Sequence, residues 1–128
     1  MFGDVYTRRG DDDLMTTGTW VPSVDIHEND LHELVIAAEL PGVDKEKIDL
    51  HVEDNTLTIR GERPPRSDVK DDQVHRVERL YGPFSRSFSL PPTANPDQAQ
   101  AEYRDGVLTV TIPKREEARP RQIRVTGG

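Results

Sequence analysis

The stretch AEYRDGVLTVTIPK at residues 101–114 decides the fold. The Asp-Gly pair at 105–106 tolerates the positive φ angles that a two-residue turn demands. After the turn, β-branched residues alternate with aliphatic ones until a proline, which cannot donate a ladder hydrogen bond, ends the strand. Successive side chains of a strand point to opposite faces, so Leu108, Val110 and Ile112 fall on one face. The stretch therefore predicts a β-hairpin with one apolar face for a core.

Short alternating segments of the same kind recur along the chain. Apolar and polar residues alternate at 48–52, and Asp54-Asn55 then supplies a tight turn into the segment at 56–60. Further runs of this kind lie at 24–26, 34–39 and 84–90. Roughly eight or nine short strands, many turn signals and almost no helical periodicity predict an all-β sandwich.

Three segments lack the pattern of a core element. Residues 1–19 are polar without periodicity, and we interpret them as a flexible N-terminal arm. The domain at 20–114 is interrupted at 61–81, where a Pro pair and mixed charges predict a long mobile loop. Residues 74–78 inside this loop alternate briefly, as an edge strand would. We expect residues 115–128 to leave the fold as an extended C-terminal extension.

Length and composition favour a single domain that associates with other chains. A chain of 128 residues suits one domain with a modest core. Hydrophobic residues make up 33% and charged residues 32%, so the core must be thin or completed by another chain. The net charge of −7, without any cluster of Lys and Arg, argues against nucleic acid or an anionic membrane as the main partner.

The sequence also predicts a cytoplasmic location. The chain contains no cysteine, which fits a reducing compartment and excludes a disulfide scaffold or a thiol nucleophile. No apolar run approaches the roughly 20 residues that span a bilayer. The N-terminus lacks the apolar centre of a secretory signal.

No motif of the sequence predicts catalysis, a metal site or a cofactor. The histidines are His27, His32, His51 and His75. They do not have the spacing of metal ligands. The serines of the segment at 84–90 share a strand face, but none lies in a G-x-S-x-G turn. No Gly-rich phosphate loop exists. We therefore expect a binding protein without enzymatic activity.

Two aliphatic residues distinguish the C-terminal extension. In an extended chain Ile123 and Val125 point to the same side, at a spacing that suits adjacent pockets along a sheet edge. The extended backbone can add ladder hydrogen bonds of its own. The alternative is that both residues belong to a last strand of the same domain.

Several motifs follow one another in a characteristic order. One is A-x-x-x-x-G-V-L at 101–108, followed by a strand that ends Ile-Pro-Lys. The others are W-x-P at 20–22 with VDI at 24–26, ELPGV at 39–43, LTIRGER at 57–63, and ER at 78–79 leading to G-x-F-S-R-x-F-x-L-P at 82–91. This series resembles the α-crystallin domain of small heat-shock proteins of the bacterial and plant type. The resemblance covers residues 20–126 and implies an immunoglobulin-like β-sandwich of two antiparallel sheets.

The resemblance also implies a homodimer made by strand exchange. In the bacterial and plant branch of the family, the strand inside the long loop leaves its own subunit and pairs with the sheet of a partner. The residues at this position here are Val74, His75, Arg76, Val77 and Glu78. The resemblance further implies an ion pair between Glu78 of one subunit and Arg86 of the other.

A second implied site concerns assembly beyond the dimer. Ile123 and Val125 are similar to the I-x-I/V tail motif that docks in a groove of a neighbouring dimer. The groove residues here would be Ile48, Leu50, Val52, Ala99, Ala101 and Tyr103. The family usually carries a larger aliphatic residue in place of Ala99, so we expect a shallower groove and weak association of dimers.

The resemblance implies an ATP-independent holdase chaperone. Such a protein binds partly unfolded clients through apolar surface that its dimers or oligomers cover reversibly, and keeps them soluble until ATP-dependent chaperones refold them. The alternative is an adaptor, a sandwich domain of the same fold that docks on one dedicated partner without holdase activity.

Overall fold

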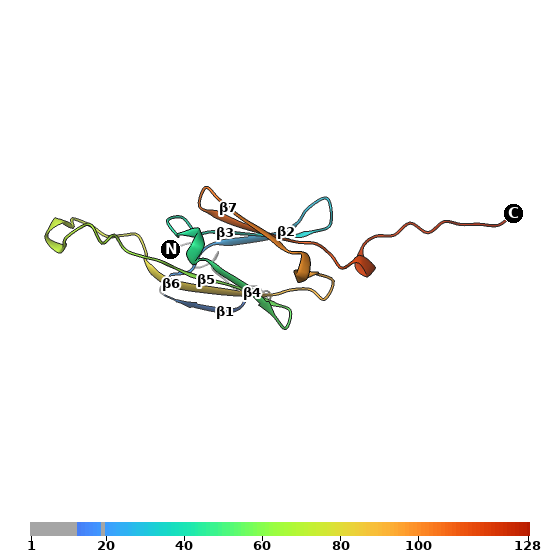
Figure 1. Ribbon diagram of the computed structural model, residues 1–128, viewed down its shortest axis with the longest axis horizontal. Helices are drawn as coiled ribbons and strands as arrows, with labels where there is room; N and C mark the ends of the chain where they lie inside the picture. The colour runs from blue at the N-terminus through green and yellow to red at the C-terminus, as the bar shows by residue number, and fades with distance from the viewer. Residues whose placement is uncertain (1–12, 19) are drawn as a thin grey trace, which may run out of the picture.

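Two antiparallel sheets of four strands each pack face to face in the computed structural model (Figure 1). The structure describes residues 13–18 and 20–128. The strands are β1 (Asp13–Gly18), β2 (Val24–Glu28), β3 (Leu34–Glu39), β4 (Asp49–Glu53), β5 (Thr56–Arg63), β6 (Gly82–Ser89), β7 (Gln100–Arg104) and β8 (Val107–Ile112). Short 3-10 helices are η1 (Lys45–Lys47), η2 (Asp71–Gln73), η3 (Pro96–Gln98) and η4 (Glu116–Ala118). The all-β sandwich expected from the sequence is confirmed.

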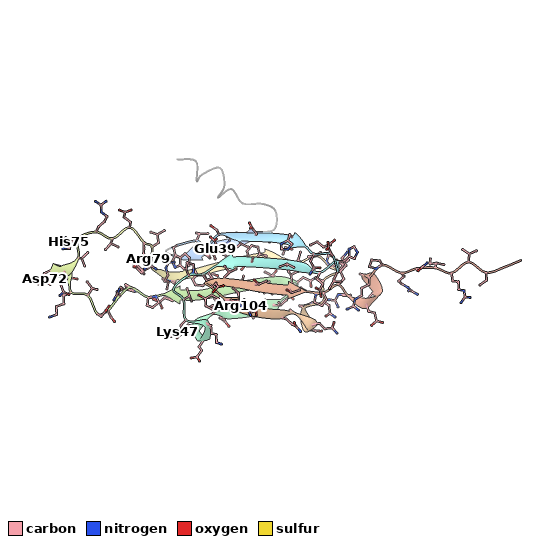
Figure 2. All side chains as sticks on the ribbon, turned by 90° about the horizontal axis from the view of Figure 1, so that it is seen from above. Glu39, Lys47, Asp72, His75, Arg79 and Arg104 are labelled. Carbon is pink, nitrogen blue, oxygen red and sulfur yellow. The ribbon has the colours of Figure 1, made fainter. Side chains whose placement is uncertain are left out.

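The order of strands leaves two edges on each sheet. The first sheet runs β1-β6-β5-β4 and the second β2-β3-β8-β7. An edge strand presents a row of backbone N–H and C=O groups to its surroundings. The segment at 64–81 and the C-terminal extension leave the sandwich at opposite ends (Figures 1 and 2). Within the described residues, no helix is long and apolar enough to cross a membrane.

The hairpin at 101–114 forms as the sequence predicts. Asp105 and Gly106 have φ angles of 55° and 78°, so both central residues of the turn are left-handed. Leu108, Val110 and Ile112 alternate inward from β8 and are 3%, 2% and 1% exposed. They pack against buried residues of both sheets: Trp20, Ile36, Ala38, Leu40, Val43, Leu57, Ile59, Phe84, Phe88, Leu90 and Ala94. One core therefore lies between the two sheets.

Two segment boundaries differ from the sequence-based expectation. The N-terminal arm was expected to extend to residue 19, but Asp13–Gly18 forms β1 and pairs with the edge of β6. Residues 1–12 of that arm lie outside the described residues. The long loop was expected to begin at residue 61, but β5 continues to Arg63, which pairs with Gly82 of β6. In both places an available partner strand outweighs a polar local sequence.

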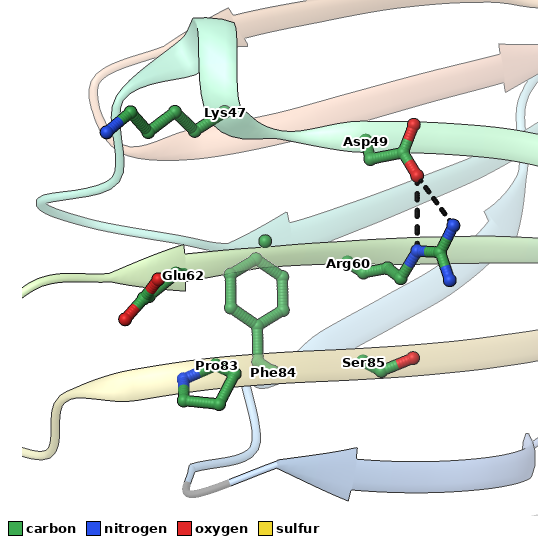
Figure 3. Close-up of a pocket in the computed structure, with 8 residues that line it drawn as sticks. Lys47, Asp49, Arg60, Glu62, Pro83, Phe84 and Ser85 are labelled. Carbon is green, nitrogen blue, oxygen red and sulfur yellow. Dashed lines mark hydrogen bonds and ion pairs between the residues drawn. The ribbon is translucent and has the colours of Figure 1, made fainter.

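Gly61 of β5 is required because η1 and a side chain of β6 approach it closely. A Cβ atom at this position would stand 2.9 Å from the carbonyl oxygen of Lys47 and 2.9 Å from Cζ of Phe84. Phe84 is only 2% exposed, so its ring has no room to retreat. Figure 3 shows the Phe84 ring beside β5, under an open hollow on the outer face of the sheet. Arg60 and Asp49 border the hollow and form an ion pair at 3.0 Å.

Replacing Gly61 with Ala should therefore destabilise the sandwich. Overpacking of a filled core costs typically about 1–3 kcal/mol. We expect a melting temperature lower by about 4–20 °C, since about 1 kcal/mol corresponds to 4–8 °C for a domain of this size. The melting temperature is measured by circular dichroism during thermal unfolding. Gly128→Ala is the control, because nothing lies within 4 Å of a Cβ there. Equal melting of Gly61→Ala and the unchanged chain would contradict the close packing.

Candidate functional site

An apolar groove runs between β4 and β7, the edge strands that face each other across one side of the sandwich. It consists of two hollows of about 480 and 400 Å³. Leu50 of β4 and Ala101 of β7 line both hollows, so the two are continuous. Leu57, Leu108 and Val110 of the core also reach the groove. These three core residues are almost fully buried and form the floor of the groove, whereas the partly buried side chains of Ile48, Leu50 and Val52 present its apolar surface.

The structure brings together all the groove residues expected from the sequence. Those contributed by the β4 side are Ile48, Leu50 and Val52, and those of the β7 side are Ala99, Ala101 and Tyr103. Their side chains pack against the core from its edge, except that of Ala101, which is exposed. Tyr103 is fixed in place because its hydroxyl donates a hydrogen bond to the carbonyl oxygen of Leu40.

The rim of the groove carries more acidic than basic residues. Glu46 and Glu102 border the hollow that contains Ile48, together with the single cation Lys45. Asp97 borders the other hollow. A groove with this lining can accept an extended segment that has apolar side chains and positive charges.

The C-terminal extension is attached to the sandwich before it becomes free. Lys114 forms an isolated bridge with Ala94, and the backbone N–H of Arg115 donates to the carbonyl oxygen of Thr93 at 2.7 Å. Beyond η4 the chain is extended without a strand. Ile123 and Val125 are 85% and 91% exposed. The alternative that they belong to a last strand of the same domain does not fit the structure.

The segment at 64–81 projects as a long loop from the other end of the sandwich, with Asp72 and His75 far from the sheets and Arg79 near them (Figure 2). It contains η2, and none of its residues from 64 to 80 is buried. Close to its start, Arg66 and Asp68 form an ion pair at 2.6 Å. The hydrogen bond from the Arg66 guanidinium lowers the pKa of the Asp68 carboxyl. The exposed apolar residues of the loop are Val69, Val74, Val77 and Leu80.

Within one chain, the residues expected at the dimer interface do not meet. Residues 74–78 form no strand and are exposed. Glu78 forms an ion pair with Arg76 at 3.0 Å. Arg86 instead lies between the sheets, where Nη1 donates to the carbonyl oxygen of Pro22 at 2.7 Å and the guanidinium lies 5.0 Å from the centroid of the Phe88 ring.

The residues of the chain match the model of the Hsp20/alpha crystallin family over positions 25–126. The chain belongs to this family. It is 39% identical over 107 residues to small heat shock protein C2 of Rickettsia felis, which covers 84% of this chain and 69% of the relative. It is 47% identical over 96 residues to an 18.1 kDa class I heat shock protein of rice, covering 73% of this chain and 60% of the relative.

Solved small heat-shock proteins have the same architecture. A small heat-shock protein from Xylella fastidiosa is 40% identical, with a TM-score of 0.72 over 85% of this chain and 99% of that one. The hspA protein from Xanthomonas axonopodis is 44% identical, with a TM-score of 0.67 over 75% of this chain and 95% of that one. The family resemblance and the fold expected from the sequence are confirmed. Small heat-shock proteins are chaperones and not enzymes, and the adaptor alternative is not favoured.

Two features of this family member were missed at the level of sequence. The floor of the groove includes the buried core residues Leu57 and Val110, because the hollow reaches down to them between the two sheet edges. Arg63 was assigned to the mobile loop, yet it is 8% exposed. A signal was present, because Leu57, Ile59, Gly61 and Arg63 occupy one face of β5 by their spacing of two.

The histidines lie on separate elements of the family fold: His27 on β2, His32 in the turn after it, His51 on β4 and His75 in the loop. In the part of the chain that the structure describes, no group of three or more side chains is arranged to hold a metal ion.

Proposed function

We propose that this family member is an ATP-independent holdase, which keeps partly unfolded proteins soluble without catalysing a reaction. The observation that carries the proposal is the groove between β4 and β7, where partly buried apolar side chains such as Ile48, Leu50 and Val52 remain accessible between two sheet edges. An unfolded client offers extended apolar segments, which such an edge can bind through side chains and backbone. A surface that is only reversibly covered suits weak binding of many clients.

The C-terminal extension supplies the reversible cover for this groove. Ile123 and Val125 lie about 7 Å apart along an extended chain, at about 3.3 Å per residue. The two hollows are lined by Ile48, Leu50 and Val52 at the same alternate spacing. Arg121 precedes the two aliphatic residues on the same face of an extended chain, and its positive charge complements the acidic rim. Docking of the extension on a neighbouring dimer would link dimers and hide the groove from clients.

The dimer itself forms by exchange of residues 74–78 onto the free edge of β2 in a partner. These residues are exposed and unpaired as a strand within one chain, and β2 ends the sheet order β2-β3-β8-β7. Arg86 supports this site, because it donates to the carbonyl oxygen of Pro22, which lies two residues before the start of β2. The Arg86 guanidinium thus lies beside β2, the strand that would pair with residues 74–78 of the partner and bring Glu78 close.

The pair of Glu78 and Arg86 can be tested by a double-mutant cycle on dimer dissociation. Arg86→Ala and Glu78→Ala should each weaken the dimer, since leaving one charge of a buried pair alone costs about 3–5 kcal/mol. The double variant should lose less free energy of dimerisation than the two single variants lose in sum. Arg60→Ala is the control, because Arg60 pairs with Asp49 on the other sheet, away from β2 and from residues 74–78. Strictly additive losses would mean that Glu78 and Arg86 do not interact.

Holdase and adaptor functions give different results with unrelated clients. Three heat-labile proteins that share no sequence are warmed with and without the chain in the absence of ATP, and light scattering is recorded. We expect scattering to fall for all three in proportion to the chain added. Failure with every client would instead support docking on one dedicated partner. In a cell, the holdase would act in the cytoplasm and pass clients to ATP-dependent chaperones.

A further inference from the structure

Arg63, the last residue of β5, is a buried cation held only by neutral groups. Its Nε donates to the carbonyl oxygen of Leu80 at 2.8 Å, Nη2 donates to the same oxygen, and Nη1 donates to the carbonyl oxygen of Pro41 at 3.1 Å. The guanidinium also lies 4.1 Å from the centroid of the Trp20 ring. Among the described residues, no carboxylate forms an ion pair with it. Burial of a charge in such surroundings requires every contact to be kept in place.

These contacts meet at the root of the long loop. Arg63 ends the strand that enters the loop, and Leu80 lies just before the strand that leaves it. Pro41 belongs to the turn after β3, in the other sheet. Trp20 adds a third anchor, since its Nε1 donates to the carbonyl oxygen of Gly82 at 2.8 Å. One planar guanidinium therefore joins both ends of the loop to both sheets, which a lysine cannot do because its ammonium is a single point charge.

We propose that Arg63 is a positioning residue that fixes the direction in which the loop leaves the sandwich. The far end of the loop, near Asp72 and His75, lies well away from its root (Figure 2). A small rotation at the root therefore becomes a large displacement of residues 74–78. Holding the root keeps these residues aimed at the partner and lowers the conformational entropy lost on binding. This inference rests on the proposed exchange of the loop between subunits.

The chain contains no cysteine, so two spin labels can be attached at chosen sites without a background. Glu39→Cys, near the end of β3, reports on the body, and Asp72→Cys reports on the loop. The labelled full-length chain is mixed with an excess of unlabelled chain, so that pulsed electron paramagnetic resonance measures distances within one chain. The distribution of distances is compared for Arg63, Arg63→Lys and Arg63→Met. Arg79→Lys is the matched control, because the Arg79 guanidinium lies beside the Tyr81 ring at the same root, while Arg63 is the side chain that donates to the carbonyl oxygens of Leu80 and Pro41.

We expect both Arg63 variants to broaden the distribution while melting stays cooperative, and Arg79→Lys to leave it unchanged. The dimer dissociation constant should rise roughly tenfold or more in the Arg63 variants, because a loop that is no longer held at its root loses more conformational entropy on binding. An unchanged distribution in both variants would overturn the proposal, as would equal broadening by Arg79→Lys. Loss of cooperative melting in both variants would show that Arg63 stabilises the whole sandwich, and this result would also overturn the proposal. The distances within one chain test the role of Arg63 even if the loop is not exchanged between subunits. Deletion of the loop tests the exchange itself.

Discussion

Deletion of residues 66–78, with Pro65 joined to Arg79 by a short Gly-Ser bridge, should produce a folded monomer. The deletion removes the segment proposed to pair with β2 of the partner but keeps the contact of Arg63 with Leu80 and the pairing of Arg63 with Gly82. We expect the dimer dissociation constant to rise at least about 100-fold, which corresponds to about 2.7 kcal/mol. Sedimentation velocity over a range of concentrations measures this change.

A second variant separates the strand from the rest of the loop. Replacing residues 66–73 by a Gly-Ser segment of the same length keeps residues 74–78 and should retain the dimer. If the variant without residues 66–78 is as dimeric as the full chain, another surface forms the dimer. If both variants are monomeric, the body of the loop contributes as much as the proposed strand.

Replacing Ile123 and Val125 together by Ala should abolish assemblies larger than the dimer. Both side chains are almost fully exposed in one chain, so docking in the groove would bury most of their apolar surface. Full burial of such a side chain contributes about 1.5–3 kcal/mol, and Ala retains only part of it. Several extensions hold one assembly together, so the docking free energy lost at each extension adds to that lost at the others. Light scattering coupled to size-exclusion chromatography should show dimers only.

The control for the extension is Gln122→Ala together with Thr126→Ala. These residues occupy the opposite face of an extended chain, so we expect them to leave the distribution of masses unchanged. A large oligomer that persists after the change of Ile123 and Val125 would show that the groove is not the site that links dimers. Such a result would leave the dimer prediction intact.

Much of the fold follows from local signals that agree with one another. At Asp54-Asn55 and Asp105-Gly106 both residues of each pair have positive φ, as the turn residues predict. Those turns fix the register of the flanking strands, and the alternation of β4 and β7 then places Ile48, Leu50 and Tyr103 along one groove. The six residues expected from the alternation and the resemblance line the two hollows, and their role as a docking groove stays a prediction.

The boundaries that local sequence missed depend on long-range pairing. β1 is polar, and its partner β6 lies far along the chain, so nothing in the segment itself predicts the strand. Arg63 lies two residues after a Gly and directly before two prolines, a sequence that favours a loop. Its position on the inner face of β5 and its hydrogen bonds to the carbonyl oxygens of Leu80 and Pro41 keep it in the fold. A charged residue can lie on an inward face when distant backbone groups satisfy it.

The most direct test of the holdase is the fate of a client after heating without ATP. A heat-labile protein is warmed with the full-length chain, cooled, cleared by centrifugation and separated by size-exclusion chromatography with light scattering. The proposed function requires the client to remain in the supernatant and to elute with the chain as a soluble complex heavier than either alone. A client that pellets completely, while the chain elutes at its unchanged mass, would contradict the holdase function.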